Sequence, residues 1–168
     1  MKRRTLLKLG IGGVAVLAVV GGGLALMRPG VVKGHLSGDA QIVMRAVARA
    51  VLEGNLPADA VDREAALHAQ MGRLDGAIAG FPAAMQAELS QLLALLASAP
   101  GRIALAGLTT AWEEATVEEL SAALQDMRVS KIALREQAYH ALRDLTNGAY
   151  FADPGTWPML GYPGPMAV

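Results

Sequence analysis

Apolar side chains recur at helical spacing along most of the chain after residue 38. In one segment, Leu67, Met71, Leu74 and Ile78 follow one another at intervals of three and four residues, which places them on one stripe of a helix. Several other segments carry a similar pattern, with Gly or Pro at their ends. The predicted helices cover about 39–53, 60–79, 82–98, 117–128 and 130–146, with a shorter helix within 102–109.

Short polar motifs mark the ends of these helices. Ser37 or Asp39 can cap the first helix, because a side-chain oxygen there accepts a free backbone N–H. Thr116 and Glu119 have the spacing of a capping box, in which each side chain accepts the backbone N–H of the other residue. The pair Asn147-Gly148 predicts the end of the last helix.

The C-terminal segment 148–168 differs from the rest in composition. It holds four of the seven aromatic residues and four of the eight prolines. Proline excludes a long helix, and the large apolar side chains do not suit a solvated tail. We therefore expect this segment to lie either on its own bundle or on another protein, and the sequence leaves both alternatives open.

These patterns predict an all-α protein, with no strand pattern in the sequence. The expected architecture is a small helical bundle with an extended, aromatic and proline-rich C-terminal arm. A signal or anchor helix precedes the bundle. The predicted boundaries are 1–30 for the signal or anchor, 31–38 for a linker, 39–147 for the bundle and 148–168 for the arm.

The N-terminal residues have the pattern of a twin-arginine export signal. Arg3 and Arg4 are followed by Leu6, Leu7 and Lys8, and then by 19 uncharged residues. Six of these 19 residues are glycines, which suits such a signal better than a permanent anchor. The run is about 28 Å long as a helix and could also span a bilayer, so both cleavage and retention as an inner-membrane anchor stay open.

Charge and cysteine content narrow the possible function classes. The first 30 residues hold five of the fifteen Lys and Arg residues and none of the fifteen acids, so the remainder is acidic. An acidic body argues against nucleic acid as a partner. The chain has no cysteine, which excludes disulfides and thiolate metal sites on this chain.

No residue pattern predicts catalysis or a cofactor site. His68 follows Glu64 by four residues and His140 follows Glu136 by four, but a di-iron bundle uses Glu-x-x-His with further glutamates. Pairing on the helix surface is the simpler interpretation. The serines lack a nucleophile-elbow motif. The sequence thus predicts no catalytic, metal-binding or cofactor-binding residue on this chain.

The C-terminal third resembles the gluconate 2-dehydrogenase subunit 3 family, the small subunits of periplasmic flavin-dependent sugar and alcohol dehydrogenases. The matching residues run from Trp112 to Pro165 and end in Tyr150-Phe151, Trp157 and the pentapeptide 161–165, Gly-Tyr-Pro-Gly-Pro. The resemblance implies a non-catalytic accessory subunit. Its partner would be a large FAD-binding dehydrogenase subunit, which is folded and exported through the twin-arginine translocase with the help of the small one. A cytochrome c subunit often takes the electrons.

The candidate partner-binding residues are five aromatics, two arginines and one proline of this region. They are Trp112, Arg128, Arg135, Tyr150, Phe151, Trp157, Tyr162 and Pro163. Aromatic and Arg side chains are enriched at interfaces, but the same arginines can also form ordinary surface salt bridges. A stand-alone, membrane-anchored helical binding module is the alternative function, and a metal-dependent enzyme is the third.

Overall fold

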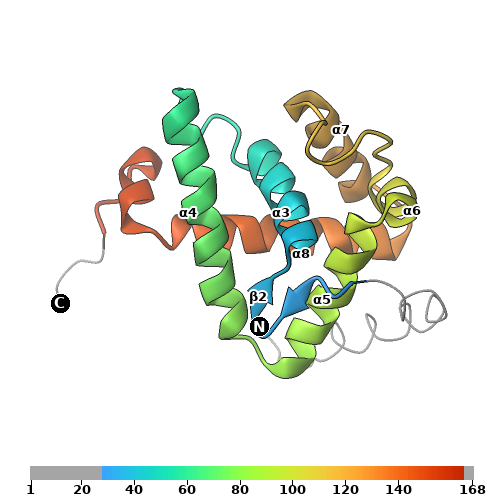
Figure 1. Ribbon diagram of the computed structural model, residues 1–168. Coiled ribbons are helices and arrows are strands. Elements are labelled where there is room, and N and C mark those ends of the chain that lie inside the picture. The colour runs from blue at the N-terminus through green and yellow to red at the C-terminus, as the bar shows by residue number, and fades with distance from the viewer. Residues whose placement is uncertain (1–27, 165–168) are drawn as a thin grey trace.

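The computed structural model describes residues 28–164 and confirms the all-α prediction. The predicted signal or anchor at residues 1–27 and the last residues of the arm, 165–168, lie outside the described residues. The main helices are α3 (Gly38–Val51), α4 (Ala60–Ala79), α5 (Ala83–Ala97), α7 (Val117–Arg128) and α8 (Ala133–Phe151). Figure 1 shows α8 crossing the bundle, with the C-terminal arm beyond α4 at its far end.

Helix α3 lies at the centre of the bundle. It packs against α4, α5, α7 and α8. Six of its side chains are buried, and they are spread over more than one face of the helix: Ala40, Val43, Met44, Ala46, Val47 and Ala48. Ser37 caps its first turn by accepting the Ala40 N–H, so the first of the two predicted caps is the one that forms.

The segment predicted as a linker is part of the folded body. Strands β1 (Val31–Val32) and β2 (His35–Leu36) form a small antiparallel hairpin. Lys33 and Gly34 both have positive φ, as a two-residue hairpin turn requires. The Val31 N–H bonds to Ser90 on α5, and the Leu36 N–H bonds to Asp75 on α4. These partners lie far along the chain, so local sequence patterns could not reveal them.

The short helix expected within 102–109 is a tight double turn. It comprises α6 (Ala99–Gly101) and the π-helical segment η2 (Arg102–Ala106), and Gly107 ends it in the left-handed conformation. A side chain at Gly101 would collide with the Leu95 carbonyl, which explains the glycine there. The predicted capping box of α7 is confirmed by both bonds between Thr116 and Glu119.

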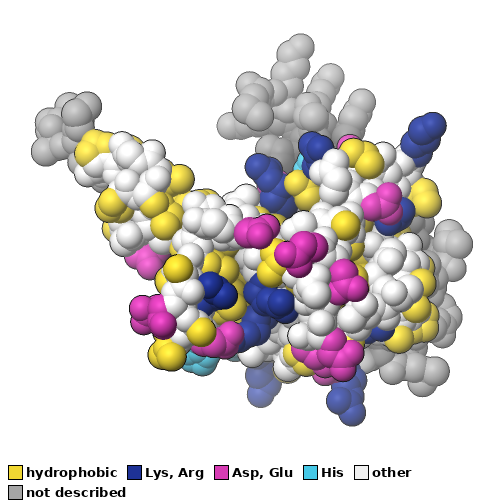
Figure 2. All heavy atoms as spheres, turned by 90° about the horizontal axis from the view of Figure 1, so that it is seen from above, with side chains coloured by type: hydrophobic (Ala, Val, Ile, Leu, Met, Phe, Trp, Pro, Cys, Tyr) yellow, Lys and Arg dark blue, Asp and Glu magenta, His cyan; other side chains and the backbone are white. Residues whose placement is uncertain are grey.

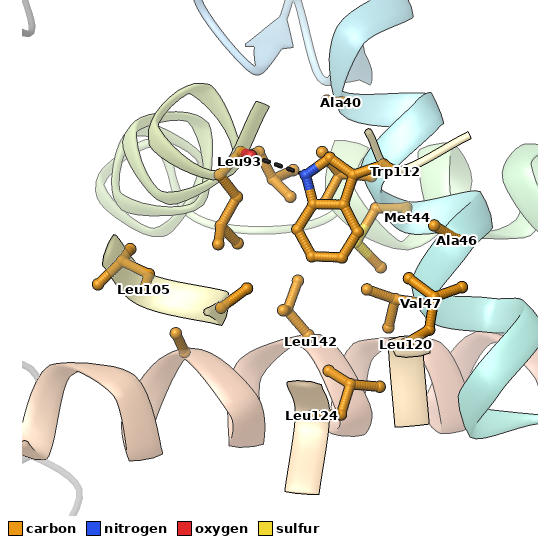
Figure 3. Close-up of a cluster of buried hydrophobic side chains, with 14 of the residues drawn as sticks. Ala40, Met44, Ala46, Val47, Leu93, Leu105, Trp112, Leu120, Leu124 and Leu142 are labelled. Carbon is orange, nitrogen blue, oxygen red and sulfur yellow. Dashed lines mark hydrogen bonds between the residues drawn. The ribbon is translucent and has the colours of Figure 1, made fainter. Parts of the chain in front are cut away.

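Trp112 sits in the middle of the main hydrophobic core, in the loop between η2 and α7. Its side chain is 2% exposed, and its indole N–H donates to the Leu96 carbonyl at 2.8 Å. Figure 3 shows the ring among side chains of several elements, including Met44, Leu93 and Leu142. The ring therefore joins α3, α5 and α8 in one core.

Helix α8 is longer than predicted. It continues through Asn147-Gly148 to Phe151. Ala149 and Tyr150 are buried, and the Tyr150 hydroxyl donates to the Asn55 carbonyl at 2.8 Å. Burial of both residues, together with the bond from Tyr150 to the loop after α3, outweighs the weak helix propensity of Asn and Gly.

Candidate partner-binding site

The arm, residues 152–164, leaves the end of α8 as a compact turn. After Ala152, Asp153 caps the 3-10 helix η3 (Pro154–Leu160) by accepting the Gly155 N–H at 2.9 Å. Gly161, with φ of 68°, ends that helix. The arm is therefore less extended than the proline content predicted. Pro154 stands in the first turn of η3, where no donor is needed, and Pro158 is accommodated inside this short helix.

Three contacts fix the base of the arm to the bundle. The Arg73 guanidinium on α4 pairs with Asp153 at 3.0 Å. The buried Thr156 hydroxyl lies within hydrogen-bond distance, 3.4 Å, of the Tyr150 carbonyl on α8. The Trp157 indole N–H donates to the Phe151 carbonyl at 2.9 Å. These bonds hold the first turn of the arm at a defined position on the folded body.

The tip of the arm is apolar and exposed. Met159 is 51% exposed, Leu160 54% and Tyr162 48%. The Trp157 and Tyr162 rings lie 5.3 Å apart, tilted by 60°. In Figure 2 the arm stands out from the body with hydrophobic side chains along it. In this chain the base of the arm thus packs on its own bundle, and its tip offers large apolar side chains to solvent.

Two of the predicted partner-binding residues are core residues in this structure. Trp112 is buried as described above, and Tyr150 is 4% exposed. Neither side chain offers a surface to a partner while the bundle is folded. Sequence reasoning grouped them with the arm because large aromatic side chains serve equally well in cores and interfaces.

The predicted arginines have different positions. Arg135 is mostly buried; its guanidinium donates to the Leu105 carbonyl at 2.6 Å and pairs with Asp126 at 2.6 Å, which ties α8 to η2 and α7. Arg128 is exposed at the end of α7, and it bonds to Gln125 one turn earlier. Arg135 therefore has a structural role, and Arg128 lies outside the arm.

The remaining candidates lie together on and next to the arm. Phe151 and Trp157 are half-buried, and Tyr162 and Pro163 are exposed. The Phe151 ring also meets the Tyr150 ring edge-on at 5.2 Å. The structure thus brings four of the eight predicted residues into one cluster at the C-terminal end of α8.

Burial raises the pKa of the Tyr150 phenol above its usual range, an effect that the nearby Arg73 guanidinium partly offsets. The folded state therefore favours the neutral phenol. The contribution of this phenol to the stability of the fold is complete below the ordinary tyrosine pKa of about 10. It is lost as the pH rises through the raised pKa of the folded state.

Replacing Tyr150 with phenylalanine is expected to lower the free energy of unfolding at neutral pH by about 1 kcal/mol, because the Asn55 carbonyl loses its donor. The variant should also lose less stability than the parent between neutral pH and about pH 11. Urea unfolding at several pH values measures both effects. Tyr162→Phe, on the exposed tip, is the matched control and should leave stability at neutral pH unchanged.

An apolar groove between α5 and α8 is a feature that sequence analysis did not identify. Its volume is about 510 Å³, and its lining is mostly aliphatic, with Met85, Leu92 and Leu145 among the side chains. The only sequence feature that pointed to this groove was the large number of leucines in the segment 82–98. They predict a widely buried helix, and the structure leaves part of that face uncovered.

The histidines do not cluster. His35 lies 3.4 Å from Asp75, and Glu64, the predicted partner of His68, pairs with Arg45 instead. Among residues 28–164, no group of three or more His, Asp or Glu side chains is placed to hold a metal ion.

Within the same residues, no single helix has the length and apolar character to cross a bilayer. One pair of consecutive helical segments, Ala83–Ala97 and Ala99–Ala106, reaches that length and apolar character when taken together, but it is bent by 90° at the break between them. Comparison with protein-family models, with curated proteins and with solved structures finds no match to this chain.

Proposed function

We propose that this chain is the non-catalytic small subunit of a periplasmic FAD-dependent dehydrogenase. In this proposal it binds the large flavoprotein subunit, assists its folding and carries it through the twin-arginine translocase. FAD and the substrate would be bound by the partner. In the alternative function, a stand-alone binding module, the same helical bundle would act without a flavoprotein partner.

The observation that carries the proposal is the exposed apolar tip of the arm. Met159, Leu160 and Tyr162 are each about half exposed on a segment whose base is fixed by hydrogen bonds. Aromatic anchors on a preorganised segment lose little conformational entropy on binding, so they suit a protein interface. The same segment carries the Trp157 and Gly161–Gly164 part of the family resemblance.

The N-terminal sequence supports a carrier role. Its paired Arg3 and Arg4 precede an uncharged run, the pattern of a route that transports folded proteins. A chain whose partner lacks such a signal could then direct the export of the assembled pair.

Purification of the tagged full chain from periplasm and membranes is expected to bring down a flavoprotein, visible as flavin absorbance in the eluate. A stable monomer that is free of flavoprotein in every fraction would contradict the proposal. N-terminal sequencing of the purified chain shows in the same experiment whether the signal is cleaved or retained.

Replacing Trp157 with alanine is expected to weaken the complex by about 2 kcal/mol, or roughly 30-fold in Kd, because a large anchor is lost from the interface. Titration of the separated subunits measures this change. Ile103→Ala removes an exposed apolar side chain of η2, away from the arm, and should leave Kd unchanged. An unchanged Kd for the Trp157 variant would place the ring in the chain's own packing only.

A further inference from the structure

The groove between α5 and α8 has the shape of a site for a third helix. Both helices pack on α3, and the groove runs along the side that they leave open. On α8 the lining includes two small residues spaced three apart, the buried Ala138 and the exposed Ala141. Small residues at helical spacing let another helix approach closely, and the flexible Met85 side chain, 48% exposed, belongs to the same lining on α5.

Most of the side chains that line the groove are apolar. Its apolar members are Phe81, Met85, Leu89, Leu92, Leu95, Leu134, Ala138, Ala141 and Leu145. The side chains of an entering helix at i, i+3, i+4 and i+7 would meet this surface, which is the usual pattern of helix-in-groove recognition. The lining residues run over about three turns of each helix, from Met85 to Leu95 on α5 and from Leu134 to Leu145 on α8. An open groove of that extent suits a helix better than a small molecule, which would be left exposed on one side.

The charges at the groove have one sign. Glu88 on α5 and Asp144 on α8 are the ionisable groups in its lining, which contains no Lys, Arg or His. Among the ion pairs of residues 28–164, Asp144 pairs only with its neighbour Arg143 and Glu88 forms none. An occupant with Lys or Arg beside Glu88 gains attraction, and it gains less beside Asp144, whose charge Arg143 partly neutralises. A second copy of this chain would bring its own carboxylates to the same place, which costs repulsion.

The groove also leads to the arm. Ala152, where the arm begins, follows Leu145 by seven residues, so it lies on the same side of α8 about two turns further on. One partner can therefore contact the groove and the exposed tip of the arm together.

We propose that the α5–α8 groove binds an amphipathic helix of the partner subunit, with large aliphatic side chains inserted and Lys or Arg beside Glu88 and Asp144. This proposal rests on the proposed function and adds a second, chemically distinct contact to it. The aliphatic side chains of the partner helix would supply most of the affinity, and its Lys or Arg residues would give the specificity.

A pair of designed peptides tests the chemistry of the groove. Both are amphipathic helices with Leu at i, i+3, i+4 and i+7; one has Lys on its flanks and the other has Glu. The full chain is expected to bind the Lys peptide at least tenfold more tightly. In the double variant Glu88→Gln, Asp144→Asn this difference should disappear. Equal affinity of the unaltered chain for the two peptides would overturn the proposal.

Ala141→Arg places a large cationic side chain in the lining of the groove. Because Ala141 is exposed, the change does not disturb the core, and Ala122→Arg on an exposed face of α7 is the matched control. We expect the Ala141 variant alone to lose peptide binding and to weaken flavoprotein capture at least tenfold. Equal capture by both variants would refute the groove contact, whereas absence of flavoprotein with the unaltered chain would refute the proposed function.

Two other occupants give distinct results. Concentration-dependent dimerisation that Ala141→Arg abolishes would make the groove an interface between copies. Tighter peptide binding after removal of residues 2–27 would make this chain's own N-terminal segment the occupant. Either result overturns the assignment to a partner helix.

Discussion

Replacing Trp112 with alanine is expected to lower the free energy of unfolding by about 3–5 kcal/mol, a large part of the stability of a domain of this size. The ring is 2% exposed in the main core, and its N–H bonds to the Leu96 carbonyl. The substitution leaves a cavity between α3, α5 and α8. It also removes the indole N–H that bonds to the Leu96 carbonyl. We expect a molecule that is largely unfolded or aggregated at moderate temperature.

Thermal and urea unfolding followed by circular dichroism measure this loss. Trp157→Ala is the matched control, because it removes the same side chain from the half-buried arm and should cost much less stability. A Trp112 variant that keeps the stability of the parent but loses its partner would instead restore Trp112 as an interface residue.

If the proposed carrier role holds, the double substitution Arg3→Lys, Arg4→Lys is expected to leave both this chain and the proposed flavoprotein partner in the cytoplasm. Lysine keeps the charge but lacks the planar guanidinium, so the paired-arginine signal is lost without a change in net charge. Cell fractionation followed by immunoblotting of both chains measures the effect. Arg28→Lys makes the same substitution outside the motif and should leave export intact.

The same experiment distinguishes the carrier role of this chain from the export of the chain itself. If this chain stays in the cytoplasm while the flavoprotein still reaches the periplasm, the carrier role is refuted. If both chains are exported normally, residues 3 and 4 do not act as a twin-arginine signal.

Most of the helical framework could be predicted because it depends on local chemistry. The apolar stripe of α4 and the capping box of α7 are encoded within a few residues, and their helices begin and end close to the predicted positions. The end of α8 was predicted five residues early, because burial of Tyr150 beside Asn55 depends on a contact 95 residues away in sequence.

The candidate site was predictable only in part for the same reason. The clustering of Phe151, Trp157, Tyr162 and Pro163 follows from their closeness in sequence. The burial of Trp112 and the bond from Arg135 to the Leu105 carbonyl depend on how separate helices meet. The groove depends on a gap between α5 and α8, and no single segment can encode a gap between two helices.

The ion pair between Arg73 and Asp153 joins residues 80 positions apart. Closing so large a loop costs entropy, so this ion pair forms only where α4 and α8 are already packed together. The complete set of contacts at the base of the arm is therefore present only in the folded bundle. A partner that recognises the positioned arm would select folded molecules of this chain over unfolded ones, and assembly would itself act as a check on folding.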